Sequence, residues 1–304
     1  MDLTGWRTFL SVCRLGSLSA AAVELGYTQS AISRQVAALE REIGVVLVER
    51  RPRGVVPTAA GETFAQHARV VVTAADRAVR VAQEAAAGRR LLTVGATPSA
   101  AAGLVPTALR DLDAAWSLTV ALTPDLEEQV ATGALDLAVV TDAPPGLAAD
   151  DRLVRDRLGD DAMRVVVAAD HPAAARRRTR RGARRRARLA DFADATWVED
   201  NDGSAALLRS AAAKAGFAPR IDLAAADLAG KTALVAAGHA VALVPGLLVP
   251  ALRRDVVAVP VADAPTRGIY ATVAAGAGPD GPAPALLERL RTALAAAPGT
   301  PSSG

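Results

Sequence analysis

The chain has 304 residues, about half of them apolar, and a formal net charge of +3. This length exceeds the roughly 100–200 residues of a typical domain, so more than one domain is expected. The single cysteine excludes an internal disulfide, charged residues interrupt any N-terminal leader, and no run of about 18 apolar residues predicts a membrane span, so we expect a soluble intracellular protein.

The positive charge is concentrated in one segment. Residues 176–188, RRRTRRGARRRAR, hold nine arginines and no acid, whereas the rest of the chain has 26 basic and 32 acidic residues. The high isoelectric point therefore reflects this segment and does not describe a uniformly basic surface.

Apolar residues at helical spacing predict three helices within residues 3–44. Gly16 and Gly26 are suited to end the first two, and Ser17 and Thr28 to cap the second and third. The third helix has a one-sided apolar stripe, formed by Ile32, Val36, Leu39 and Ile43. We therefore expect two short helices, a tight turn and a third helix.

The start of the third helix, within GYTQSAISRQVAALE at 26–40, is unusually rich in short polar side chains. By itself this pattern fits either a solvated helix end or a face that meets something polar. The segment VVLVERRPRGVVPT at 45–58 predicts a hairpin with a turn that contains three arginines. The complete order of helices, turn and hairpin predicts a winged helix-turn-helix, in which the third helix reads the DNA major groove.

The candidate DNA contacts are polar or basic side chains of the third helix and of the wing. Gln can pair with adenine, Arg with guanine and Ser with several acceptors, while wing arginines can neutralise phosphate or enter the minor groove. These candidates are Thr28, Gln29, Ser30, Ser33, Arg34, Gln35, Arg50, Arg51 and Arg53.

A long helix is predicted next, from Ala59 to about Ala87, because no helix breaker follows Gly61. Apolar residues alternate four and three positions apart along it, as in a coiled-coil seam. We expect this seam to meet a second copy of the chain through Phe64, Ala68, Val71, Ala75, Ala78 and Ala82.

After residue 90 the pattern changes to short β-rich runs separated by helical stretches. The runs are LLTVGA, SLTVAL, LDLAVV, MRVVVAA, AVALVP and IYATVAA, and the helical stretches include 103–113, 126–132 and 204–215. Strands that alternate with helices predict parallel α/β layers.

The N-terminal sequence resembles that of LysR-type transcriptional regulators. The matching features are GSxxxAA in the second helix, TQSAIS at the start of the third, LExxxG at its end and PTxAG before the long helix. Val48 and Pro57 depart from the usual Phe and Leu, which affects only packing of the wing. The resemblance continues through LTVGATPSAAAGLVPTAL, VATGALDLAVV, DHPAA, KAGFAPRI and LVAAGHAVALVP.

The resemblance implies a multidomain α/β protein with a periplasmic-binding-protein-like effector module of two subdomains. We expect the winged helix-turn-helix domain at 1–58, the linker and dimerisation helix at 59–88 and the effector domain at 89–304, with subdomain I at 91–163 and 268–298 and subdomain II at 164–267. It also implies a bacterial cytoplasmic, sequence-specific regulator that forms dimers and, in many members, tetramers. Its partners would be double-stranded promoter DNA, a small-molecule effector and RNA polymerase, with no membrane, metal or cofactor.

Effector contacts are expected where strands end and helices begin, because free backbone N–H groups there favour anions. The candidates are Thr97, Ser99, Ala100, Thr123, Thr141, Asn201, Asp202, Ser204 and His239. A helix N-cap is the alternative role for each hydroxyl, and a simple surface position is the alternative for His239. Asp202 is a departure, since a carboxylate there could repel an acidic ligand or recognise an amine.

The arginine-rich segment 176–188 leaves two interpretations open. It could touch flanking DNA or an acidic surface of RNA polymerase, or it could be a self-repelling, solvated loop.

An α/β enzyme with an accessory DNA-binding domain is the alternative class. GAGPDG at 276–281 matches GxGxxG, but Pro279, Pro282 and Pro284 are expected to prevent the helix that this fingerprint requires. The three histidines and one cysteine offer little for a metal site, and Cys13 lies on an apolar stripe where it is expected to be inert. The sequence therefore favours a regulator over an enzyme.

Overall fold

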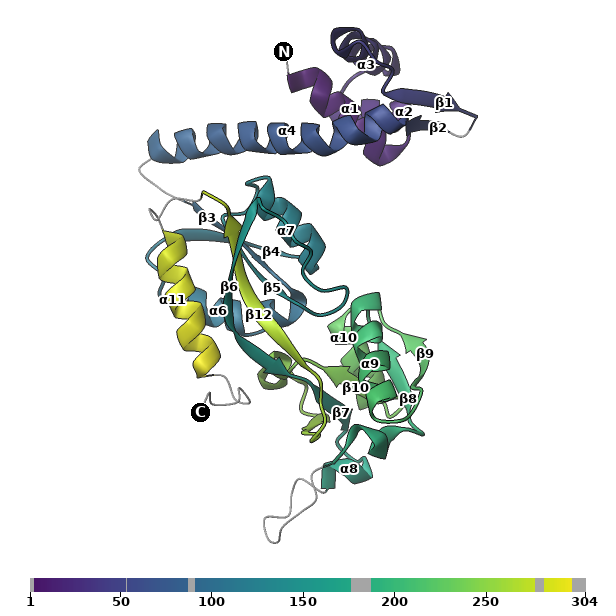
Figure 1. Ribbon diagram of the computed structural model, residues 1–304, viewed down its shortest axis with the longest axis vertical. Coiled ribbons are helices and arrows are strands. Elements are labelled where there is room, and N and C mark those ends of the chain that lie inside the picture. Colours follow the sequence, from purple (N-terminus) through teal and green to yellow (C-terminus); the bar gives the residue numbers. More distant parts are fainter. Residues whose placement is uncertain (1–2, 53, 87–90, 176–186, 277–281, 297–304) are drawn as a thin grey trace. The chain divides into compact units, whose positions relative to one another are not determined.

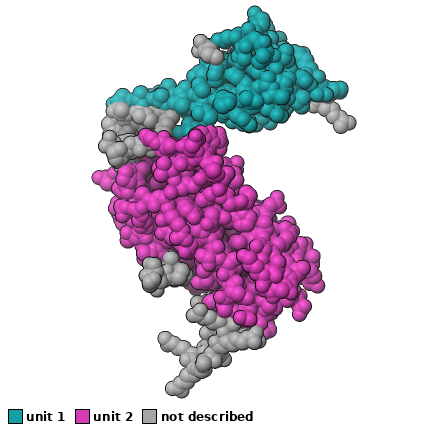
Figure 2. Space-filling view, in the orientation of Figure 1, with its two compact units in different colours: residues 1–90, 131–134 teal, residues 91–130, 135–304 magenta. Residues whose placement is uncertain are grey.

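The computed structural model describes residues 3–52, 54–86, 91–175, 187–276 and 282–296. The chain divides into two compact units, residues 1–90 with 131–134 and residues 91–130 with 135–304 (Figure 2).

The first unit has the predicted order of helices and hairpin (Figure 1). Its elements are α1 (Leu3–Leu15), α2 (Leu18–Leu25), α3 (Gln29–Ile43), β1 (Val48–Arg51), β2 (Gly54–Pro57) and α4 (Ala59–Ala86). The Ser17 and Thr28 side chains accept hydrogen bonds from the first turns of α2 and α3, and Gly26 and Gly44 end these helices in the left-handed conformation. The expected caps are confirmed.

Helix α4 begins against the base of the wing. Thr58 Oγ1 accepts a hydrogen bond from Gly61 N (3.0 Å) and donates one to Val46 O (2.9 Å). A Cβ atom added to Gly61 would lie 2.0 Å from Leu47 O, so only glycine fits this close approach. This geometry is the physical reason for the PTxAG pattern.

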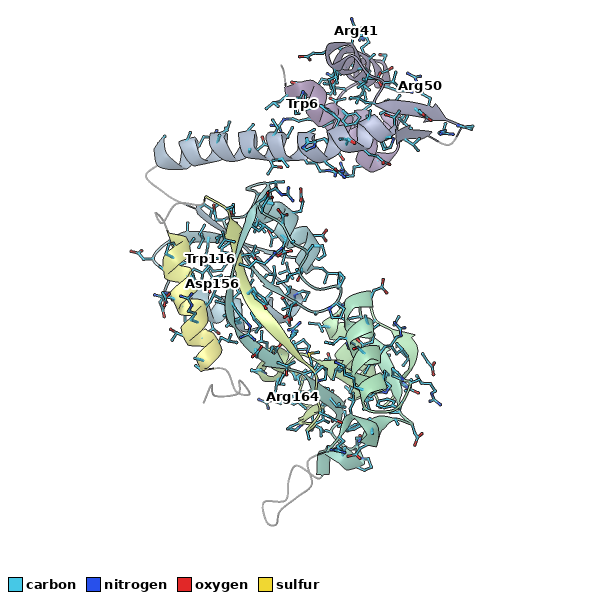
Figure 3. All side chains as sticks on the ribbon, in the orientation of Figure 1. Trp6, Arg41, Arg50, Trp116, Asp156 and Arg164 are labelled. Atoms are coloured by element: carbon cyan, nitrogen blue, oxygen red, sulfur yellow. The ribbon has the colours of Figure 1, made fainter. Side chains whose placement is uncertain are left out.

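The second unit contains a five-stranded sheet in the order β4-β3-β5-β12-β6. Its strands are β3 (Leu91–Ala96), β4 (Ala115–Val120), β5 (Leu137–Thr141), β6 (Leu153–Ala162) and β12 (Thr266–Ala274). Helices α5 (Pro98–Ala101), α6 (Leu104–Leu109), α7 (Thr123–Ala131) and α11 (Pro282–Ala295) complete this layer. Leucines of α11 join the sheet in one buried core, and Asp156 of β6 pairs with Arg291 of α11 (Figure 3).

The remaining elements of the second unit lie between β6 and β12 in the sequence. The three-stranded sheet has the order β10-β7-β11, from β7 (Arg164–Ala168), β10 (Ala242–Val244) and β11 (Val256–Val259), and β8 (Thr196–Glu199) pairs with β9 (Arg220–Ala224). The helices here are α8 (Pro172–Ala175), α9 (Asp202–Lys214) and α10 (Leu228–Ala236), with short 3-10 turns at η1 (Leu189–Phe192) and η2 (Gly246–Ala251). The chain passes from β6 into this part at residue 163 and returns through β12.

One expectation from the sequence held in part and a second was wrong. β3 runs parallel to β4 and β5, and β8 runs parallel to β9, but β12 runs antiparallel to both β5 and β6, and β7 runs antiparallel to β10 and β11. A helix does start among the prolines, since α11 begins at Pro282 and also contains Pro284. The backbone N–H groups in the first turn of a helix have no helical partner. Proline, which lacks this N–H, is therefore tolerated there.

Candidate nucleic-acid interface and ligand cavity

The N-terminal turns of α3 present a polar surface. Thr28 Oγ1 accepts from Ala31 N (3.2 Å) and lies 3.0 Å from Ser30 Oγ, so the cap fixes the first turn. Gln29, Ser30 and Arg34 are exposed and Ser33 is half-buried. The buried stripe of Ile32, Val36 and Leu39 lies on the other side of the helix.

The wing supplies one arginine to this surface. Arg50 Nη2 donates to Ser33 Oγ (2.8 Å), so strand β1 and helix α3 share a hydrogen bond, and Arg50 lies beside α3 in Figure 3. Arg51 instead pairs with Glu49 (2.6 Å), which offsets part of its charge. Arg53 lies outside the described residues.

Gln35 is oriented differently from the other candidates. Its Oε1 accepts a hydrogen bond from Thr8 Oγ1 of α1 (2.5 Å). Gln35 is half-buried, and in the sequence it lies between Ile32 and Val36 of the apolar stripe. Gln35 therefore ties α3 to α1 and does not belong to the exposed polar surface. The sequence could have shown this, because Gln35 falls on the flank of the apolar stripe.

The expected seam of α4 divides into two parts. Phe64 packs edge-on against Trp6 and Phe9, with ring centroids 4.9 and 5.4 Å away, and Ala68 is fully buried in the same core. Arg7 Nη1 also donates to Asp76 Oδ2 (2.8 Å), which fastens α1 to α4. Val71, Ala78 and Ala82 are exposed and Ala75 is half-buried, so only this later part of the seam is open.

The second unit contains a cavity of about 500 Å³. Residues from α5, α7, β5, α9, α10, β10 and β12, and from the loops beside them, contribute to its wall. Its apolar lining is formed by Pro98, Leu122, Pro124, Ala143, Pro144, Pro145, Met163, Leu207, Leu228, Leu243 and Pro245. Its polar lining is formed by Thr97, Ser99, Thr123, Thr141, Asp200, Asn201, Asp202, Ser204, Lys231 and Arg267. Its volume and mixed lining are typical of a small-molecule site.

One polar group of the cavity gathers around Arg267, at the start of β12. Its guanidinium donates to Asp161 Oδ2 from Nε (3.0 Å) and Nη2 (2.8 Å), and Nη2 also donates to Ser99 Oγ (2.6 Å). Asp161 Oδ1 accepts from Leu247 N (3.0 Å). Thr97 is 4% exposed, and its Oγ1 has no hydrogen-bond partner within the described part of the chain.

A second polar group gathers around Lys231, which is 1% exposed. Its Nζ donates to Glu199 Oε2 and to Asp200 Oδ1 (3.0 Å). Ser204 Oγ donates to Glu199 Oε2 (2.5 Å) and lies 3.1 Å from Asp200 Oδ1. Burial raises the pKa of the Glu199 carboxyl, although Lys231 and Ser204 act to lower it. The group thus holds two carboxylates against one ammonium.

Most of the expected effector residues line this cavity, with two exceptions. Ala100 has a side chain buried in the core of the large sheet and does not line the cavity. His239 is exposed in the turn after α10 and is also absent from the lining. Gly238 adopts a positive φ of 78° there, so the turn closes the helix and leaves the imidazole outside the cavity.

Several of the hydroxyl and amide candidates also have local structural roles. Asn201 caps α9 by accepting from Ser204 N (2.9 Å). Thr123 Oγ1 donates to Thr141 O (3.2 Å) and accepts from Thr141 N (3.3 Å), which joins α7 to β5. The N-cap alternative, which was considered for the hydroxyls, does not hold for Thr97, because Thr97 begins α5 without a side-chain cap.

Sequence reasoning missed Arg267 and Lys231. Lys231 lies three residues after Leu228 and four before Val235, so it interrupts the apolar stripe of α10, and this was the available signal. Arg267 is the second residue of β12 and lies 106 residues from Asp161 in the sequence. Only the strand pairing of β12 with β6 brings these two side chains together.

The described ranges contain no group of three or more His, Cys, Asp or Glu residues suited to a metal ion. Burial raises the pKa of the Cys13 thiol to about 11, which fits an inert thiol. In the same ranges no helix has the length and apolarity needed to cross a membrane. The arginine-rich segment lies outside the described residues except for Ala187 and Arg188.

Two protein-family models match the chain. Residues 3–62 match the helix-turn-helix of the bacterial regulatory lysR family, and residues 85–295 match the LysR substrate binding domain. Among curated relatives, the Hca operon transcriptional activator HcaR of Escherichia coli is 34% identical over 57% of this chain and 59% of its own length. The small neutral protease regulatory protein of Streptomyces coelicolor is 32% identical over 73% of this chain and 67% of its own. The chain thus spans about three fifths of the first of these relatives.

Solved structures share the fold. The LysR family regulator CbnR has a TM-score of 0.69 at 22% identity and covers 96% of this chain and 99% of its own. CbnR complexed with its target DNA has a TM-score of 0.67 at 23% identity, over 96% of this chain and all of that chain. Identities this low support the fold alone.

Proposed function

The chain belongs to the LysR family of bacterial transcriptional regulators, and we propose that it binds promoter DNA in a sequence-specific way under the control of a small effector. The observation behind this proposal is the pairing, in one chain, of an exposed polar recognition helix with a separate unit that holds a cavity of about 500 Å³.

On DNA, we propose that α3 enters the major groove with Gln29, Ser30 and Arg34 toward base edges. Arg50 would then lie between helix and wing, where its guanidinium can reach phosphate while Ser33 holds it. Gln35 has no base-reading role in this proposal, because it binds Thr8.

We propose that the functional form is at least a dimer, joined through the exposed part of α4 that includes Val71, Ala75, Ala78 and Ala82. Two recognition helices would address half-sites about 34 Å apart or a multiple of this distance. Tetramer formation and contact with RNA polymerase belong to the same proposal. So do action in the bacterial cytoplasm and a regulatory rather than catalytic role.

The effector would bind in the cavity near Thr97, Ser99, Arg267 and Lys231. It can shift the protein between two arrangements only if it binds one of them more tightly. The DNA complex and the effector are therefore coupled, and each must change the affinity for the other by the same factor.

The experiment is a gel shift of the full chain on the intergenic DNA upstream of its own gene, with random competitor, at two salt concentrations. A discrete complex that survives competitor and the higher salt supports the proposal. Binding that disappears with random competitor on this and other promoters would leave only electrostatic attraction and contradict it.

A further inference from the structure

The two polar groups of the cavity differ in what they offer a ligand. The side chains around Arg267 have hydrogen-bond donors that are not in use. Thr97 Oγ1 is buried without a partner, Ser99 Oγ accepts from Arg267 and so keeps its own proton to donate, and Arg267 Nη1 makes no hydrogen bond in the described part of the chain. Three donors from residues that line the same cavity suit a carboxylate.

The side chains around Lys231 have hydrogen-bond acceptors that are not in use. Two carboxylates, Glu199 and Asp200, share one ammonium and one hydroxyl, and Glu199 Oε1 is buried without a partner in the same described ranges. Asp200 lines the cavity, and Asp202 adds a third carboxylate from an exposed position. This wall therefore carries more negative than positive charge, and Lys231 and Ser204 already donate hydrogen bonds to its carboxylates.

We propose that the cavity binds a small zwitterion whose carboxylate lies at Thr97, Ser99 and Arg267 and whose ammonium group lies at Asp200. This inference rests on the proposed function of the cavity as the effector site. The apolar wall formed by Leu122, Leu207 and Leu228 accommodates a hydrocarbon body between the two charged ends.

Other ligand classes fit the two ends less well. A dicarboxylate brings a second negative charge to the wall that already has an excess of acid, and like charges at short range repel. A simple amine leaves the donors at Thr97, Ser99 and Arg267 unmatched. A buried polar group left without a hydrogen bond costs more free energy than a typical hydrogen bond contributes. One end of the cavity would therefore oppose the binding of a dicarboxylate or of a simple amine.

The probes are matched trios tested on the full-length protein by thermal shift and calorimetry. One trio is leucine, 4-methylpentanoate and 3-methylbutylamine, and a second is 5-aminopentanoate, pentanoate and butylamine. The wider panel contains the other proteinogenic α-amino acids and the ω-amino acids of four and six carbons. We expect at least one zwitterion to bind, and loss of either charged group to weaken its binding by roughly 10-fold or more. Failure of every zwitterion at millimolar concentration, or equal binding by a deaminated acid or a dicarboxylate, overturns the proposal.

Two variants test the two ends of the cavity separately, and a third serves as a control. Thr97→Val removes only an unpartnered hydroxyl, so it should weaken the zwitterion and its deaminated acid alike, by roughly 3- to 10-fold. Thr272→Val is the matched control, because Thr272 Oγ1 is also buried without a partner in the described chain but lies outside the cavity lining. Asp200→Asn should weaken the zwitterion by roughly 10-fold and leave the deaminated acid unaffected. Equal effects of Thr97→Val and Thr272→Val, or of Asp200→Asn on both ligands, contradict the assignment.

The outcome is separable from that of the proposed function. A sequence-specific gel shift combined with failure of all zwitterions rejects only the ligand class. Zwitterion binding combined with purely electrostatic DNA binding leaves the ligand class standing and rejects the regulatory proposal.

Discussion

Replacement of Lys231 by methionine should destabilise the second unit strongly. Lys231 is 1% exposed and its ammonium lies against Glu199, which is 4% exposed, and Asp200. Methionine is close in volume, so packing changes little, but both carboxylates lose their counter-ion. Removal of one partner of a buried ion pair costs about 3–5 kcal/mol, because a buried charge remains uncompensated. That is a large part of the 5–15 kcal/mol that typically separates folded from unfolded states.

The second step is the double variant Lys231→Met with Glu199→Gln. The glutamine keeps the shape and can still accept from Ser204, but it carries no charge. The double variant should therefore regain about half of the lost free energy of unfolding, or more, since the two effects are coupled. Lys214→Met is the control, because Lys214 is exposed on α9 and its loss should cost about 0.5 kcal/mol or less.

Denaturant unfolding followed by tryptophan fluorescence measures these values. Trp197 is fully buried in β8 of the second unit and reports on it, and Trp6 reports on the first unit. A Lys231→Met variant as stable as the Lys214→Met control would refute the reasoning. So would a double variant no more stable than Lys231→Met alone.

Burial raises the pKa of Glu199, so this carboxyl stabilises the fold most below its unfolded pKa of about 4.3 and loses that contribution as pH rises through its folded pKa. In denaturant titrations, the free energy of unfolding of Glu199→Gln should therefore rise relative to that of the wild type between pH 4 and 8. A decrease of this difference between variant and wild type over the same pH range would contradict the prediction. Arg34→Ala should cost about 1–3 kcal/mol at one base position in gel shifts if Arg34 reads guanine, whereas equal loss on specific and random DNA excludes that role. Gly61→Ala would place Cβ 2.0 Å from Leu47 O, and should lower the free energy of unfolding reported by Trp6 by at least about 2 kcal/mol. An unfolding curve that coincides with that of the wild type would disprove this prediction.

The first unit was the part most open to prediction from sequence. Its helix boundaries depend on local signals: the hydroxyl caps at Ser17 and Thr28 and the left-handed glycines at Gly26 and Gly44 act within a few residues of the chain. Phe64 and Ala68 of the expected seam pack in the core of their own unit, and Gln35 was assigned by its chemistry alone. Its position relative to the apolar stripe would have placed it against α1.

The second unit was harder to predict because its strands pair over long sequence separations. An apolar run such as IYATVAA indicates a buried strand but not its direction, and β12 proved antiparallel to both neighbours. Hydroxyls near strand ends were found because strand ends are local features. Arg267 and Lys231 were not found from the sequence. Their role at the cavity depends on ion pairs with Asp161 and Glu199, which lie 106 and 32 residues away.

Arg267 also lies where a ligand could act on the whole unit. Its guanidinium joins Ser99 beside β3 to Asp161 at the end of β6, and Asp161 in turn accepts from Leu247 N of η2. Gly246 lies so close to this junction that a Cβ there would be 2.7 Å from Ala162 O. These contacts lie at the two points where the chain passes between the large sheet and the sheet of β7, β10 and β11. A carboxylate that binds Arg267 Nη1 competes with Asp161 for the charge of the same guanidinium, so it should alter the junction itself as well as fill the cavity. Asp161→Asn would weaken that competition while it keeps an acceptor for Leu247 N, and we expect it to tighten carboxylate binding but reduce the ligand's effect on the DNA complex. Tighter binding with an unchanged effect in the gel shift would show that the junction does not transmit the signal.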